Sequence, residues 1–198
     1  MYILPIDELN VFTTNLEEHF DTDPETGKRR IKSEQDKEDI IDEMFDLLMM
    51  AYRNGTISAN MDLSAEITPE FERVEQAIYK PIAGRTWKDR IEEYASTECT
   101  PFDIQRIAET DMTRIFNTAV IDVGNKFESE RWTGSVMKVW NTMLDDRVRD
   151  THAYLESIRV PLLAEFYTFD GDHALAPGMF EMPENNINCR CTISLRRG

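Results

Sequence analysis

Two cysteines stand one residue apart near the end of the chain, in the segment NCRC at 188–191. On an extended strand, residues i and i+2 point to the same face, so both sulfurs could meet one ligand while Arg190 points to the opposite face. A zinc site on this pair would take further ligands from His152, His173 or Cys99. Zinc sites more often space their cysteines as C-x-x-C, and a disulfide between the two is geometrically poor. Two small buried thiols that pack a tight corner are therefore the favoured interpretation.

A second group of residues suited to chemistry has the sequence DDRVRDTH at 145–152. If this segment is helical, Asp145, Arg149 and His152 fall at i, i+4 and i+7 on one face. An acid, a base and a titratable ring could then project into a common site. The simpler interpretation is a helix that begins with Asp145 as its cap and carries solvated charges beyond it.

Enzymatic hypotheses draw on the same residues. Cys191, His152 and Asp146 would nominally supply a nucleophile, a base and an orienting acid, although nothing in their spacing selects them. A metal-dependent hydrolase or nuclease-like domain would bind zinc through His152, Cys189 and Cys191, with an open ligand position and Asp146 beside it as a base. The sequence contains no GxGxxG or GxxxxGK loop to cradle a phosphate.

The net charge limits the partners that the chain can bind. It has 22 basic and 38 acidic residues, a formal charge of -16. That field repels phosphate backbones and favours a partner protein with a basic or dipolar surface. A local contact with DNA could use, for instance, one basic stretch, which acidic residues surround and which is favoured as a solvated turn. Its members are Lys28, Arg29, Arg30 and Lys32.

Targeting and membrane signals are missing from the sequence. The start has no basic residues and no long apolar stretch, so we expect no secretory signal. No apolar run approaches the roughly 20 residues of a membrane span. We therefore expect a cytosol-like compartment without membrane association, where the three cysteines are thiols or metal ligands.

The pattern of apolar residues divides the first half of the chain into two regions. Residues 1–33 are predicted to form a short peg and a flexible polar loop. Residues 34–99 have helical periodicity, which begins with a helix over about 38–52 that stops at Gly55. Helix-start signals occur at two threonines, Thr68 and Thr86. We interpret 34–99 as a helical region that docks on a partner.

Residues 100–198 are predicted to form a smaller module. Thr100, followed by a proline, opens the longest helical pattern, which runs to about residue 127. The pattern then predicts a strand at 136–143, a short helix at 145–157, an irregular loop at 158–183 and a closing strand at about 189–195. The predicted fold class is α+β, with a mostly α-helical N-terminal part followed by a small C-terminal α+β module with short antiparallel strands.

The order of motifs in this module resembles that of the phage Mu F-like head morphogenesis family, the minor head (minor capsid) proteins of tailed phages. In that pattern, a polar helix precedes a W-x-x-x-x-D-x-R-x-R-x-x-H segment, a proline-glycine loop and a terminal N-C-R-C. The matching residues are Arg106, Glu109 and Thr110; Trp140, Asp145, Arg147, Arg149 and His152; Pro177 and Gly178; and Asn188, Cys189, Arg190 and Cys191. The resemblance covers about 106–193.

The resemblance implies a non-enzymatic virion component at the portal vertex, which acts in head morphogenesis, DNA packaging or ejection control. Its partners would be the portal protein and other head or connector proteins, with a local contact to packaged DNA as a further option and no small-molecule substrate. It would reside in the virion and, during assembly, in the host cytoplasm. Asp145, Arg149 and His152 would tie their helix to the strand bearing the two cysteines, without a cofactor, zinc being the alternative.

Overall fold

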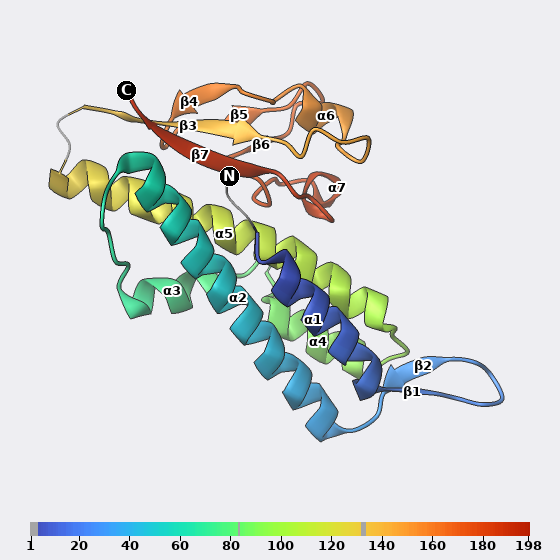
Figure 1. The fold of residues 1–198 in the computed structure, drawn as a ribbon. Coiled ribbons are helices and arrows are strands. Elements are labelled where there is room, and N and C mark those ends of the chain that lie inside the picture. Colours follow the sequence, from blue (N-terminus) through green and yellow to red (C-terminus); the bar gives the residue numbers. More distant parts are fainter. Residues whose placement is uncertain (1–3, 83, 132–133) are drawn as a thin grey trace.

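The structure is a computed structural model that describes residues 4–82, 84–131 and 134–198. Two long helices form its framework. Helix α2 (Glu34–Leu63) packs along helix α5 (Pro101–Arg131), as Figure 1 shows. Both helices repeat apolar residues at helical spacing, and these positions are buried. Among them are Ile40, Met44, Leu48, Ile104, Ile115 and Phe116. Burial of these two faces supplies the largest part of the core.

Shorter helices flank this pair. They are α1 (Ile6–Leu16), the 3-10 turn η1 (Glu17–His19), α3 (Phe71–Ile78) and α4 (Trp87–Ala95). Helix α4 begins at the predicted cap: the Thr86 hydroxyl accepts a hydrogen bond from the Asp89 amide at 3.1 Å, and the Asp89 carboxylate accepts one from the Thr86 amide at 2.7 Å. The start predicted at Thr68 was wrong, because Asn60 makes two hydrogen bonds to the backbone of Ile67 and holds that segment extended.

The polar segment predicted to be a flexible loop contains a hairpin. Strand β1 (Phe20–Thr22) pairs antiparallel with β2 (Arg29–Ile31), with Phe20 opposite Ile31. These two side chains are buried, whereas the residues of the turn between the strands are exposed. The prediction of a flexible loop was therefore wrong. The two buried apolar residues, Phe20 and Ile31, lie too far apart in sequence to give the alternating pattern that indicates strands.

Helix α2 does not stop at Gly55, and this prediction was also wrong. It continues for two more turns and ends with Ser64 in the left-handed conformation, φ 47°. A Cβ atom on Gly55 would lie 2.3 Å from the Phe116 carbonyl oxygen and 2.9 Å from the Ala119 Cβ of α5. The missing side chain therefore lets the two helices approach, which is a packing role and not a break in the helix.

Small antiparallel sheets form a second layer over the helices. Strand β3 (Val136–Asn141) lies between β4 (Arg159–Pro161) and β7 (Thr192–Arg197), and β5 (Phe166–Tyr167) pairs with β6 (His173–Ala174). The short helices α6 (Asp150–Ala153) and α7 (Pro183–Asn186) complete the layer. In Figure 1, β7 lies between the long helices and the rest of the sheets. The α+β prediction is confirmed.

Three elements of the module differ from their predictions. The helix predicted at 145–157 reduces to α6, because Leu144 and Ser157 adopt left-handed conformations and Asp145 closes a separate turn. The closing strand begins at Thr192, so both cysteines precede it. The loop predicted at 158–183 contains the three short strands β4 to β6.

A single apolar cluster runs through both layers, from Leu9 of α1 to Leu195 of β7. The carboxylate of Asp62 in α2 accepts a hydrogen bond from the Leu195 amide and binds Arg196, both at 2.8 Å. The predicted boundary between 34–99 and 100–198 therefore crosses a shared core, and the division into regions stays a prediction. Within the described ranges, no helix is both long and apolar enough to span a membrane.

The close approach at Gly55 predicts whether replacing this glycine stabilises or destabilises the fold. In an open helix, Gly→Ala stabilises by about 1 kcal/mol. Gly55→Ala should instead destabilise by about 1–3 kcal/mol, because the new methyl group overlaps the α5 backbone. Chemical denaturation measures the change, with the exposed Arg53→Ala on the same helix as a control. A Gly55→Ala variant more stable than the natural protein would contradict this packing.

Candidate functional site

His152, Cys189 and Cys191 lie together inside the C-terminal module. The Nδ1 atom of His152 is 3.5 Å from the sulfur of Cys189 and 3.6 Å from the sulfur of Cys191. The three possible ligand atoms lie within 4.8 Å of one another, and all three residues are buried. The two sulfurs face one partner, although the segment that carries them is not the strand that the sequence predicted.

The two thiols titrate as a coupled pair. The Cys191 thiol donates a hydrogen bond to the sulfur of Cys189, and this bond, aided by His152, brings the pKa of Cys189 well below its usual value. The same bond, together with burial, raises the pKa of Cys191. A thiolate is the form of cysteine that binds metals.

The polar residues of 145–152 hold the cysteine segment in place, although not from one helical face. The Asp145 carboxylate binds the Arg190 guanidinium at 2.7 Å, and this bond lowers the pKa of Asp145. Arg149 donates to the carbonyl of Ile187. The predicted i, i+4, i+7 arrangement was wrong, because Asp145 and Arg149 precede α6 and reach the segment from a turn.

An aromatic cluster positions the His152 ring. The ring stacks on Phe180 at 5.3 Å and meets Trp140 edge to face at 5.5 Å. Trp140 in turn contacts Phe166 at 5.1 Å. Among the described residues, none makes a hydrogen bond to Nε2 of His152. The ring is therefore oriented by packing, with Nδ1 directed at the sulfurs.

Helix α5 supplies two buried residues that the sequence analysis did not identify. Thr113 donates to the carbonyl of Cys189 at 2.7 Å. Asn117 donates to the carbonyls of Cys191 and Pro177, both at 3.2 Å, and accepts from the Ile193 amide at 2.9 Å. Their signal in the sequence is a pair of polar residues four apart on a helix whose buried positions are mostly apolar.

The proline-glycine loop lies against the same helix. Gly178 has φ +82°, and a Cβ atom there would be 3.0 Å from the Cα of Arg114. Both the conformation and the close approach require glycine at this position. The carbonyl of Pro177 accepts the hydrogen bond from Asn117, so the loop is joined to the helix that also holds the cysteine segment.

Buried polar side chains close the loop on its other side, and these were also missed. Asn186 accepts from the Phe180 amide at 2.9 Å and donates to the Phe180 carbonyl at 2.7 Å. Asp172 accepts from Asn185 at 2.8 Å and from three backbone amides. Their side chains replace the backbone pairing that an irregular loop lacks.

Several predicted residues lie away from the cluster. Arg106 bonds to Tyr94 at 3.1 Å, and Glu109 accepts from Gln105 at 2.7 Å on the same helix. The other candidate zinc ligands are not brought together with His152: His173 contacts Glu165 at 3.3 Å, and Cys99 follows α4 and bonds to the hairpin.

A small cavity adjoins the cluster and opens toward a larger groove. The cavity has a volume of about 10 Å³. The groove, of about 800 Å³, extends to α1 and α5 and has Glu109 on its wall. Five residues line both: Met143, Arg147, Arg149, Asn188 and Arg190. No aspartate or glutamate is among the described residues that line the small cavity, so Asp146 is not placed there as a base.

The fold and the site define an α+β module in which a histidine and two cysteines close an irregular corner against a long helix. The family model of phage Mu protein F like protein matches residues 71–194. The chain therefore belongs to this family, and the match begins at α3, well before the position expected from the motifs alone. No solved structure matches the chain.

One curated relative is an enzyme by name. The chain is 32% identical over 97 residues to the NAD(+)-arginine ADP-ribosyltransferase EFV of Enterococcus faecalis. The matched part covers 48% of this chain and 19% of that protein. The similarity thus concerns about a fifth of the relative's length.

A buried lysine stands beside the aromatic cluster. Lys138 points inward from β3, in the same row as Trp140, and its ammonium lies 5.2 Å from the centre of the Phe166 ring. The part of the chain that the structure describes offers it no hydrogen bond. Burial lowers the pKa of Lys138 to about 7. The motifs of the family did not single out this residue.

The lowered pKa of Lys138 makes stability depend on pH. Between pH about 7 and the ordinary lysine pKa of about 10.4, the unfolded chain binds a proton here that the folded chain does not, so stability rises with pH by up to about 1.4 kcal/mol per unit. Lys138→Met should therefore be more stable than the natural protein at pH 7, with a difference that shrinks toward pH 10.

Denaturant unfolding at a series of pH values measures this difference. The control is Lys80→Met, which removes an exposed lysine and should leave the pH profile unchanged. A Lys138→Met variant that is less stable at pH 7, or that keeps the slope of the natural protein, would show that Lys138 has a charged partner in the folded state.

Proposed function

We propose that this chain is a minor head protein of a tailed phage, which binds at the portal vertex and acts in head morphogenesis, DNA packaging or ejection control. The observation that carries the proposal is the family match, which covers α3 to β7 and includes every element that holds the site. The protein would act in the virion head and, before that, in the host cytoplasm during assembly.

The contacts of the site support a non-enzymatic role. Three motif residues around the cysteines contact another part of the chain: Asp145 bonds to Arg190, Arg149 bonds to a carbonyl, and His152 lies against both sulfurs. No described carboxylate lines the cavity beside them, so a hydrolase would lack a base there. The name ADP-ribosyltransferase belongs to the relative. Because the match covers 19% of that protein, the match does not support this activity in the present chain.

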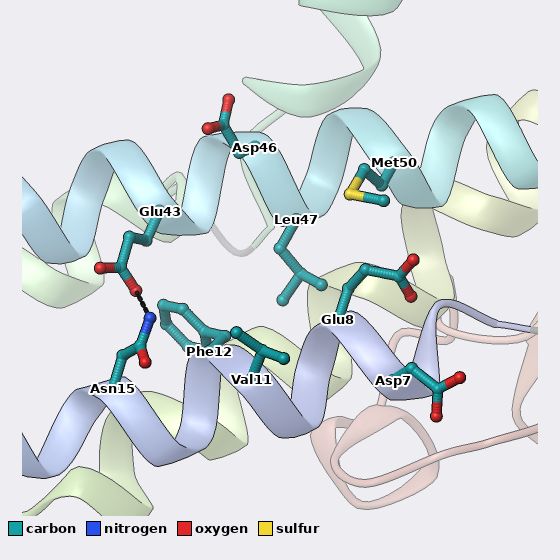
Figure 2. A pocket seen from close by; sticks show the side chains of 9 residues that line it. All are labelled: Asp7, Glu8, Val11, Phe12, Asn15, Glu43, Asp46, Leu47 and Met50. Carbon is teal, nitrogen blue, oxygen red and sulfur yellow. Dashed lines mark hydrogen bonds between the residues drawn. The ribbon is translucent and has the colours of Figure 1, made fainter.

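A groove between α1 and α2 is the surface that we propose for docking. Figure 2 shows Phe12 and Leu47 between the two helices, with Val11 and Met50 beside them. Val11 is 61% exposed and Met50 37%. The groove has a volume of about 470 Å³, and a hydrogen bond from Asn15 to Glu43 crosses one end (Figure 2).

The charge of this groove indicates which kind of partner segment would bind in it. Acidic side chains from both helices line it: Asp7, Glu8, Glu43 and Asp46. An apolar floor with an acidic border is complementary to an amphipathic segment with a basic face. We assign it to a basic amphipathic segment of the portal protein. The basic loop is a poorer contact for packaged DNA, because Lys28 and Arg29 bind Glu98 and Glu17 at 2.6 and 2.7 Å.

Head assembly in cells tests both statements. The chain is expressed with the portal, scaffold and major head proteins of the phage that encodes it, and purified heads are examined for its presence and, by electron cryomicroscopy, its position. We expect density at the portal vertex. Val11→Asp with Met50→Asp should abolish incorporation, because charge enters an apolar and already acidic groove. Met61→Asp, which changes an exposed methionine elsewhere on α2, is the matched control.

The possible outcomes test the proposed function and the proposed docking face separately. If the natural chain is absent from heads, or lies away from the portal vertex, the proposed function is wrong. If the natural chain is at the vertex and the double variant still joins it, the function stands and the groove is not the docking face.

A further inference from the structure

We propose that His152, Cys189 and Cys191 bind a zinc ion, as three protein ligands of one tetrahedral centre. Zinc holds sulfur at about 2.3 Å and nitrogen at about 2.05 Å, so a tetrahedral angle would separate a ligand sulfur from a ligand nitrogen by about 3.6 Å. The observed Nδ1 to sulfur distances are 3.5 and 3.6 Å. The two edges between nitrogen and sulfur are therefore already spaced as in such a site, and all three atoms lie within 4.8 Å of one another.

The hydrogen-bonding capacity of the three groups also favours an ion. Nδ1 of His152 has one position for a hydrogen bond, either a lone pair or a proton, yet two sulfurs lie at nearly equal distance from it. All three atoms are buried, where a weak or missing hydrogen bond is costly. One ion between them satisfies each atom, and two thiolates balance its charge.

The ligands are held in place by groups outside the cluster. Thr113 and Asn117 fix the backbone carbonyls of the two cysteines, and the Phe180 and Trp140 rings fix the imidazole. Such outer contacts orient the ligands of metal centres and tune their affinity. The site is thus built by the fold.

The fourth ligand in the isolated chain would be solvent. The cavity of about 10 Å³ beside the three ligands has room for one water. Arg147, Arg149 and Arg190 line it and favour a ligand of partly negative character, such as a zinc-bound water.

The ion would lock the C-terminal corner of the module. It would join α6 to the segment that leads into β7, where the described strands are short and the links are otherwise side-chain hydrogen bonds. Zinc supplies this kind of link in small domains with little regular structure. The inference rests on the geometry of the cluster and is independent of the proposed function.

Metal content and cobalt substitution test the site in the full chain. Protein purified under reducing conditions should contain one zinc per chain by elemental mass spectrometry. After chelation, added Co²⁺ should give the near-ultraviolet sulfur-to-cobalt charge-transfer band and the intense visible bands of tetrahedral cobalt thiolate. Cys189→Ser and Cys191→Ser should lose the ion, whereas Cys99→Ser, which removes the third buried thiol, should retain it.

Measurements on the natural chain decide the result even if the cysteine variants do not fold. A chelator should lower its melting temperature, and Zn²⁺ should restore it, with the same shift in Cys99→Ser. Natural protein that contains no zinc, gives no charge-transfer band with Co²⁺ and melts at the same temperature with and without Zn²⁺ would overturn the proposal. The cluster would then be a hydrogen-bonded thiol pair with an imidazole.

Discussion

Asn117 makes the interaction on which the rest of the structure depends. This buried amide sits in the middle of α5 and bonds to the backbone of the cysteine segment, the proline-glycine loop and β7. A buried amide that loses these partners is costly, so the three segments can occupy only one position relative to the helix. Elsewhere on α5, Phe116 and Ala119 pack against Gly55 of α2. Helix α5 therefore couples the helical layer to the corner that holds the site.

The corner itself is stabilised by side chains where regular backbone pairing ends. Asn186 and Asp172 satisfy backbone groups of the loop, and Asp145 and Arg149 fasten the cysteine segment from the opposite side. A set of linked polar contacts of this kind defines one conformation when every member is satisfied. Nε2 of His152 and the ammonium of Lys138 are exceptions within this layer, and the ammonium is buried against an aromatic ring. The cost of that burial appears as the lowered pKa of the lysine.

Features that depend on neighbours in sequence could be predicted, and features that depend on distant residues could not. The cap at Thr86 is local, and so are the periodic faces of α2 and α5, and all three were identified from the sequence. Gly55 looks like a helix stop in its local context, and only its contact with α5 explains why the helix continues.

The same distinction holds for the site. The order of motifs was sufficient to predict that His152 would meet both cysteines. The sequence did not reveal Thr113 and Asn117, since a polar residue on a buried helix face has a meaning only when its partner is known. The short helix predicted at 145–157 failed for a related reason, because Asp145 and Arg149 are used for contacts with the cysteine segment and not for a helix.

The central claim of this account is that the long helices and the C-terminal corner form one cooperative unit joined through α5. Native-state amide hydrogen exchange tests it most directly, since it measures the free energy of opening at each residue. The amides of Ile193 and Leu195 in β7 should exchange with the same opening free energy as those of Ile115 and Phe116 in α5. Exchange of the β7 amides at a clearly lower free energy, while α5 stays protected, would show that the corner opens alone and would contradict the claim.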